Sequence, residues 1–273
     1  MEQKNKLKLN SGGLLVFILT VGVFGIINTE MGVVGILPLI AETFKVSVPQ
    51  AGWTVSVFAL VVAASALLFS GVNRKKVMLL ALGLFTLSNI ISMLTTNFTV
   101  LLIARILPAF LHPVYVSMAF TVAAASVSKE KAPKAVSKVF VGVSAGMVLG
   151  VPVTSFIASE VSFSMAMLFF TVVNALVLIA TILFIPSMPV KEKVSYGAQL
   201  SVLRKKVMWH SIIAVTLING AMFGFFSYMS DYLKTVTEVS YSVISVENYY
   251  LSMRGVQSLS CPLRCWFPIY VFL

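Results

Sequence analysis

The sequence predicts an all-α membrane protein, a polytopic helix bundle, and three observations support that prediction. The 273 residues are 59% hydrophobic and only 11% charged, whereas soluble domains contain about 25% charged residues. Seven apolar runs are each long enough to cross a bilayer, which takes roughly 20 residues of helix. The connections between these runs also alternate in charge, as expected when successive helices cross a membrane in opposite directions.

The apolar runs cover residues 12–38, 51–70, 77–96, 99–127, 136–158, 162–186 and 207–233. The first run follows Lys4, Lys6 and Lys8, as the apolar part of a signal peptide does, but it is too long for that role and is interpreted as a retained helix. The fourth run contains Pro108 and Pro113, and each proline lacks a backbone donor. We therefore expect the fourth helix to be kinked.

Basic residues gather in alternate connections. The segment before the first run, residues 74–76, residues 129–138 and residues 187–206 together hold 15 basic and 3 acidic residues, whereas the rest of the chain holds 5 basic and 6 acidic residues. Cytoplasmic loops of membrane proteins are enriched in lysine and arginine. The sequence therefore predicts a multi-pass protein of the bacterial inner membrane with its N-terminus in the cytoplasm.

Other classes of function find little support. The net charge is +11, but the basic residues lie in short clusters between apolar runs, so nucleic acid is not a predicted partner. Cys261 and Cys265 are too few for a disulfide framework or a metal-ligand set. The sequence has no glycine-rich phosphate loop with its lysine and no nucleophile–base set. We therefore predict no enzyme activity, no metal and no cofactor.

The sequence divides into four predicted parts. They are a six-helix bundle at 1–186, a cytoplasmic linker at 187–206, the start of a second half at 207–245, and an irregular tail at 246–273. In the linker, Leu200, Leu203 and Val207 recur at helical spacing beside basic residues, which suits either a short helix on the inner membrane surface or a solvated linker. The tail follows either from a coding register disrupted near Ser245 or Val246, or from a short segment on the membrane surface.

Three local patterns occur in the first, fourth and fifth runs. They are Asn28-Thr29-Glu30 followed by Gly32, Gly35, Leu37 and Pro38; Arg105 to Ala109 followed by His112 and Pro113; and Gly142, Gly146, Gly150 and Pro152. In this order, and with the alternating charge, they resemble the major facilitator superfamily of secondary transporters, in its bacterial sugar- and drug-efflux branch of proton antiporters. The resemblance covers residues 1 to about 245.

The resemblance implies a fold of twelve helices in two similar halves. Because six helices here occupy about 186 residues, the chain resembles an N-terminal half with one further helix, truncated after the seventh. The family's cytoplasmic gating loop lies between the second and third helices. Here it corresponds to Gly71 and Arg74-Lys75-Lys76, and it lacks the acidic residue that the family usually carries.

Glu30 and Arg105 are the predicted centre of proton coupling. Both are expected about 9 Å below the outer membrane surface, at 1.5 Å per residue from the helix ends, and the resemblance places both helices along a central cavity. Burial favours the protonated form of a carboxylate, whereas a nearby cation favours its ionised form. An ion pair between Glu30 and Arg105 would therefore suit a carboxylate that takes up and releases a proton. The alternative is that Arg105 extends along the helix to the membrane surface.

His112 follows Arg105 by seven residues and shares its helix face. It is either a proton relay or a hydrogen-bonded packing residue. Tyr115 flanks the same face and, with Asn28, is assigned to the substrate cavity. Gly142, Gly146 and Gly150 form a strip of small residues that permits close helix approach. With Pro152, this strip serves either generic packing or the seal of an antiporter, where the fifth helix closes against the other half.

The predicted function is a secondary active transporter that exports a sugar or an amphipathic drug in exchange for protons by alternating access. Its partners are the small-molecule substrate, protons and the lipid bilayer, and the oligomeric state stays open. One alternative is a transport-inactive half or membrane scaffold from a frameshifted gene. Another is a dimer in which two N-terminal halves form one pathway.

Overall fold

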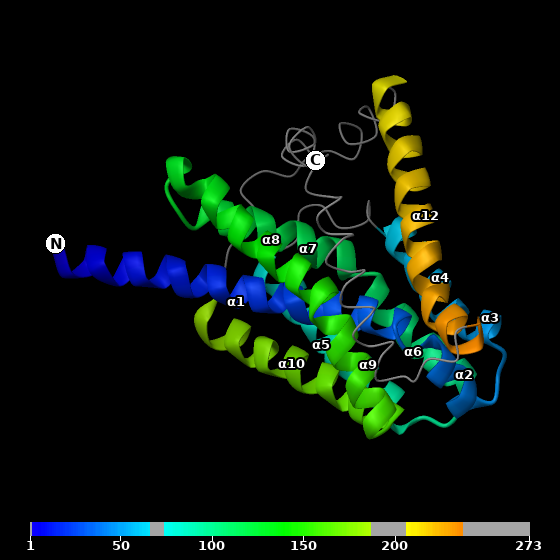
Figure 1. Cartoon of the computed structure of the whole chain (residues 1–273). Coiled ribbons are helices and arrows are strands. Elements are labelled where there is room, and N and C mark those ends of the chain that lie inside the picture. The colour runs from blue at the N-terminus through cyan, green and yellow to red at the C-terminus, as the bar shows by residue number, and fades with distance from the viewer. Residues whose placement is uncertain (1, 66–73, 187–205, 237–273) are drawn as a thin grey trace.

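A computed structural model describes residues 2–65, 74–186 and 206–236, and these residues fold into helices joined by short turns (Figure 1). The helices are α1 (Glu2–Val34), α2 (Leu37–Phe44), α3 (Val48–Ala51), α4 (Trp53–Ser65), α5 (Arg74–Leu94), α6 (Phe98–Ala109), α7 (His112–Ala125), the 3₁₀ helix η1 (Lys129–Lys131), α8 (Ala132–Val148), α9 (Gly150–Glu160), α10 (Phe163–Phe184) and α12 (Lys206–Val236).

Within the described ranges, six segments are long and apolar enough to cross a membrane. They are Gly12–Val34, Val48–Ser65, Arg74–Leu94, Phe98–Ala125, Lys129–Glu160 and Phe163–Phe184. The predicted all-α membrane bundle is therefore confirmed. The seventh apolar run forms α12. Gly71, most of the predicted linker, and the predicted tail with Cys261 and Cys265 lie outside the described residues.

The first helix is shorter at its C-terminal end than the apolar run that predicts it. It ends at Val34, and after a turn the chain starts α2 at Leu37 with Pro38 in its first turn. Because Pro38 has no backbone N–H, it cannot donate to the Val34 carbonyl and continue the helix. The predicted bound at residue 38 is therefore wrong by one short turn.

The fourth spanning segment is bent between α6 and α7, as its prolines predict. Pro108 lies inside α6, and Pro113 lies in the first turn of α7. Pro113 cannot donate to the Ala109 carbonyl four residues earlier. The hydroxyl of Ser65 on α4, which donates to the Val62 carbonyl at 3.1 Å, also lies 3.4 Å from the Ala109 carbonyl and so offers a donor near the acceptor that the proline leaves open.

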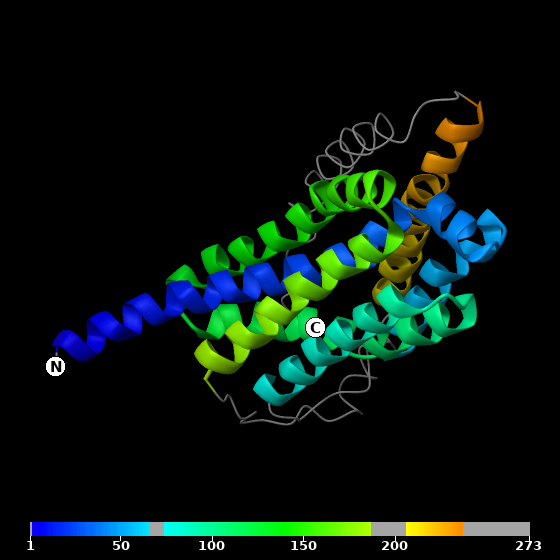
Figure 2. The same cartoon turned by 90° about the horizontal axis from the view of Figure 1, so that it is seen from below.

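Helix α1 occupies the middle of the bundle. It packs against α8 and α9 on one side, against α10 on another, and against α7, and two views at right angles show it between these helices, with its N-terminal turns projecting beyond them (Figures 1 and 2). The hydroxyl of Thr20 on α1 donates to the carbonyl of Lys138 on α8 at 3.2 Å. Side chains of α1 therefore meet most of the other spanning segments, which is why the candidate site is built around it.

The basic segments meet at one end of the bundle. The ammonium group of Lys75, at the start of α5, donates to the carbonyl of Ile182 in the last turn of α10 at 3.0 Å. Gly12 of α1 lies beside the carbonyl of Ser126, just before the lysines of η1. At the other end, the hydroxyl of Ser164 on α10 donates to the carbonyl of Met93 on α5 at 3.1 Å. Helices α5 and α10 are therefore antiparallel, with the basic start of α5 beside the end of α10.

Candidate functional site

The centre of the candidate site is a contact between an acid and a base from two helices. Oε2 of Glu30 on α1 lies 3.0 Å from Nε2 of His112, the first residue of α7. The Glu30 side chain is 20% exposed and that of His112 is 10% exposed. Neither ring nitrogen has an aligned hydrogen-bond partner within the described ranges. The contact is therefore an ion pair only when His112 carries a proton.

Two aromatic rings hold His112 in place. The Phe58 ring of α4 lies edge-on to the imidazole, with centroids 5.7 Å apart, and the Phe85 ring of α5 lies 6.2 Å away. Both phenylalanines are buried. His112 therefore packs between α4 and α5 and presents one ring nitrogen to Glu30, which combines the packing role with the possibility of proton exchange.

Arg105 does not make the expected ion pair with Glu30. Its Nε donates to the carbonyl of Thr54 on α4 at 3.1 Å, and its guanidinium carbon lies 5.3 Å from the centroid of the Phe58 ring. The direct partner of Glu30 is instead His112. The expected pair is wrong because Arg105 is anchored on α4, where Phe58 contacts both Arg105 and His112.

Arg105 also does not extend to the membrane surface. The residue is only 5% exposed, so the alternative interpretation of a surface-reaching arginine is wrong as well. A buried guanidinium needs a partner for its donors, because charge is costly to place in hydrocarbon. The carbonyl of Thr54 and the electron-rich face of Phe58 supply part of that compensation.

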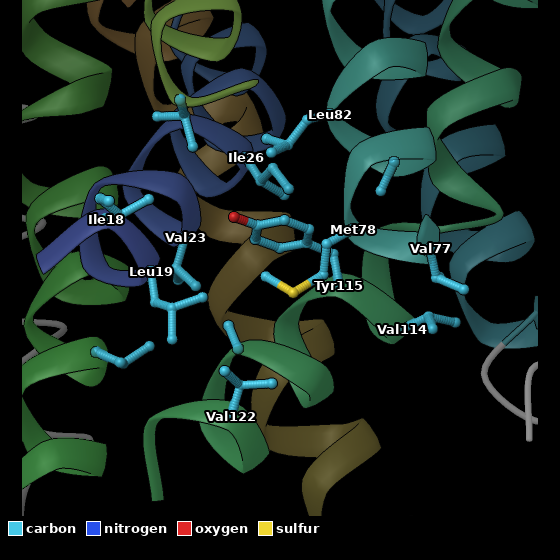
Figure 3. Packing of buried hydrophobic residues seen from close by; sticks show 14 of the residues in the cluster. Ile18, Leu19, Val23, Ile26, Val77, Met78, Leu82, Val114, Tyr115 and Val122 are labelled. Atoms are coloured by element: carbon cyan, nitrogen blue, oxygen red, sulfur yellow. The ribbon is translucent and has the colours of Figure 1, made fainter. Parts of the chain in front are cut away.

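The two residues assigned to a substrate cavity lie in the packed interior. Asn28 is completely buried, and its Oδ1 accepts a hydrogen bond from the Thr154 hydroxyl of α9 at 3.4 Å. Tyr115 is also completely buried, among apolar side chains of α1, α5 and α7 (Figure 3). A Cβ at Gly22 of α1 would collide with the Tyr115 hydroxyl. Neither side chain is accessible to a substrate in this conformation.

The glycine strip of the fifth spanning segment packs against α1. A Cβ at Gly142 would collide with the Thr20 carbonyl, one at Gly146 would lie 3.0 Å from the side chain of Ile27, and one at Gly150 would collide with Asn28. The strip therefore has its partner within this bundle, so the expectation that it faces the other half is wrong for these glycines. Pro152 lies in the first turn of α9, just past the break that separates α9 from α8.

A buried polar cluster beside Glu30 did not feature among the predicted site residues. The amide nitrogen of Asn174 on α10 donates to the Thr29 hydroxyl of α1 at 2.9 Å, and that of Asn89 on α5 approaches the same hydroxyl at 3.5 Å. All three residues are at most 2% exposed. The signal that reveals them is the isolated asparagine in each of the two apolar runs, because polar groups inside a membrane are expensive and mark interhelical contacts.

The residues predicted to form the cytoplasmic gating loop, Arg74, Lys75 and Lys76, lie at the start of α5. Arg74 and Lys75 are partly buried and Lys76 is exposed. The bond from Lys75 to Ile182 joins α5 to α10. Ile182 is among the last four residues of α10, whose carbonyls have no partner within the helix, so a lysine donor is favourable there.

Comparison with known proteins identifies relatives over most of the chain. A model of the Major Facilitator Superfamily matches residues 17–257. The chain is 31% identical over 233 residues to the uncharacterized MFS-type transporter YtbD of Bacillus subtilis, covering 84% of this chain and 59% of that protein. It is 28% identical over 226 residues to the inner membrane transport protein YdhP of Escherichia coli, covering 81% and 58%. The chain thus spans about three fifths of the length of these relatives.

Solved structures show a similar fold. A bacterial homolog of the human lysosomal transporter Spinster, in an inward-facing and unoccupied conformation, aligns with a TM-score of 0.65 at 17% identity, covering 96% of this chain and 63% of that one. The peptide transporter POT in complex with sulfate aligns with a TM-score of 0.58 at 13% identity, covering 93% and 51%. At these identities the likeness concerns the fold alone.

Proposed function

Because this chain belongs to the Major Facilitator Superfamily, we propose that it functions as a secondary active transporter that exports a small molecule in exchange for protons. The observation that carries the proposal is the 3.0 Å contact between Glu30 and His112. It joins the first and fourth spanning segments through two groups that both exchange protons. The proposed substrate is a sugar or an amphipathic, drug-like molecule.

The charge state of the pair supplies a coupling mechanism. When His112 is positively charged and Glu30 is ionised, the two side chains attract each other and draw α7 toward α1. A second proton, on Glu30, removes that attraction while His112 stays charged. Loading and release of this proton would therefore favour different arrangements of the first and fourth segments, which is what alternating access requires.

Arg105 has a supporting role in this proposal. Its Nε is held by the carbonyl of Thr54, so its positive charge stays on the neighbouring segment without a direct contact to Glu30. Phe58 lies against both Arg105 and His112. Phe58 keeps the Arg105 guanidinium of α6 packed against α4. His112 then remains the base that contacts Glu30.

The proposed orientation places the basic end of the bundle in the cytoplasm. The start of α5 carries Arg74, Lys75 and Lys76, and the start of α8 carries Lys134 and Lys138. The end of α10 is bonded to the start of α5. The enrichment of lysine and arginine in cytoplasmic loops supports this orientation, in a bacterial inner membrane with the N-terminus inside. The bond between Lys75 and Ile182 would then hold the cytoplasmic ends of α5 and α10 together.

Transport by the reconstituted chain tests the proposal. Liposomes with an acidic interior would be given either ethidium or radiolabelled lactose outside, and uptake would be followed with and without nigericin, which collapses the pH gradient. We expect gradient-dependent uptake of one probe, and loss of that dependence in Glu30→Gln. Uptake that ignores nigericin would contradict proton antiport. Absence of uptake for both probes would contradict the proposed substrate class and favour a transport-inactive half.

A further inference from the structure

We propose that Lys131, at the N-cap of α8, together with Lys134 and Lys138 in its first two turns, forms a binding site for the headgroup of an anionic phospholipid. These lysines follow one another at spacings of three and four residues, so they lie on one face of the helix. All three are exposed. The proposal concerns the lipid surface of the bundle and does not depend on the transport activity proposed above.

The depth of the lysines matches the headgroup layer. Residues 140–159 carry no charge, and 20 helical residues at 1.5 Å each cover the hydrocarbon core of about 30 Å. Counted outward from Phe140, the Cα of Lys138 lies about 3 Å and that of Lys134 about 9 Å beyond the core. The flexible stems allow both ammonium groups to reach the phosphate level.

The positive charge on this face has no acidic partner among the described residues. Glu130 is the sole acidic residue of the sequence between positions 43 and 159. No ion pair within 4.0 Å joins it to these lysines in the described part of the chain. The lysines also lie at the N-terminal end of α8, where the helix dipole adds positive potential. An anion is therefore the complementary ligand.

The same helix face continues as an exposed apolar surface, which identifies the anion as a lipid. Val141, Leu149 and Phe156 follow the lysines at helical spacing along α8 and α9 and are 60%, 49% and 56% exposed. A soluble anion gains nothing from such a surface, whereas acyl chains below a bound headgroup lie against it. Lysines directly above exposed apolar side chains are the arrangement that a phospholipid fits.

Native mass spectrometry of the full chain in detergent tests this site. Palmitoyl-oleoyl phosphatidylglycerol and the corresponding phosphatidylcholine would be titrated separately, and the fraction of chain carrying one lipid measured. We expect the anionic lipid to bind more tightly. The double variant Lys134→Gln and Lys138→Gln should weaken its binding on the order of tenfold, since each lysine near an anionic surface contributes a several-fold factor. Lys134→Arg with Lys138→Arg should restore it.

Two controls make the result specific. The variant Lys45→Gln with Lys234→Gln removes the same charge from the end of α2 and from α12, and it should leave phosphatidylglycerol binding unchanged. Glycerophosphoglycerol, which has the headgroup without acyl chains, should not compete. Equal binding of the two lipids, equal loss in both double variants, or competition by glycerophosphoglycerol would each overturn the proposal.

Discussion

Glu30 of α1 and His112 of α7 lie 3.0 Å apart, although they are 82 positions apart in the chain. The contact exists because α7 begins at His112, directly after the bend that Pro108 and Pro113 impose on the fourth spanning segment. The bend and two phenylalanine rings aim the imidazole at α1. The side chains of Glu30 and His112 are 20% and 10% exposed, so the acid and the base meet in a largely enclosed contact between the two segments.

Replacing the acid should remove proton coupling while keeping the fold. Glu30→Gln preserves the shape of the side chain but cannot exchange a proton, so gradient-driven uptake should fall at least tenfold, about 1.4 kcal/mol, with little change in thermal unfolding. Liposome uptake and circular dichroism measure the two quantities. Glu160→Gln, at the exposed end of α9, is the matched control. Unchanged coupling in Glu30→Gln would rule out this residue as the proton carrier.

Phe58 should be important both for stability and for the separation of Arg105 from Glu30. Phe58→Leu removes the ring that lies against the guanidinium and the imidazole, with an expected loss of about 1–2 kcal/mol in the free energy of unfolding. It should also alter the pH profile of uptake, because Arg105 is freed to approach Glu30. Thermal unfolding in detergent and uptake at several pH values measure these effects. A shift in stability with an unchanged pH profile would limit Phe58 to packing.

The close approach of α8 to α1 should make Gly142 intolerant of a side chain. In Gly142→Ala the new methyl group meets the backbone carbonyl of Thr20, which cannot move without shifting α1. We expect a loss of about 1–3 kcal/mol in stability, as for overpacking. Gly83→Ala on α5 is the control, since nothing lies within 4 Å of its new methyl, and it should stabilise the chain by roughly 0.5–1 kcal/mol. Equal melting shifts in both variants would contradict the tight contact.

The hydrogen bond from Asn174 to Thr29 should stabilise the packing of α10 on α1. Asn174→Leu removes this donor, and interhelical hydrogen bonds in membranes contribute roughly 0.6 kcal/mol, at most about 1.7. Melting of the purified chain, followed by circular dichroism, gives the loss. In Thr171→Val the removed hydroxyl binds the Met167 carbonyl of its own helix, so a smaller effect is expected. A larger loss in that control than in Asn174→Leu would argue against the interhelical bond.

Much of the architecture follows from local properties of the sequence. Apolar length determines the spanning segments, and proline chemistry determines where the first helix ends and where the fourth bends, because both depend on residues within one segment. The order of motifs was enough to identify the family. The clustering of lysines at one end follows from alternating charge in consecutive connections.

The partners of individual side chains depended on the tertiary structure. Helical spacing assigns Glu30 and Arg105 to faces of their own helices, but it does not say which ring lies between those helices or which base is nearer. The structure places Phe58 against Arg105 and brings His112 to Glu30. It also buries Asn28 and Tyr115, because the glycines opposite them let the helices pack closely. Which side chains touch between two helices depends on how each helix is rotated and how far apart the two helices lie. The order of residues along one helix does not specify either quantity.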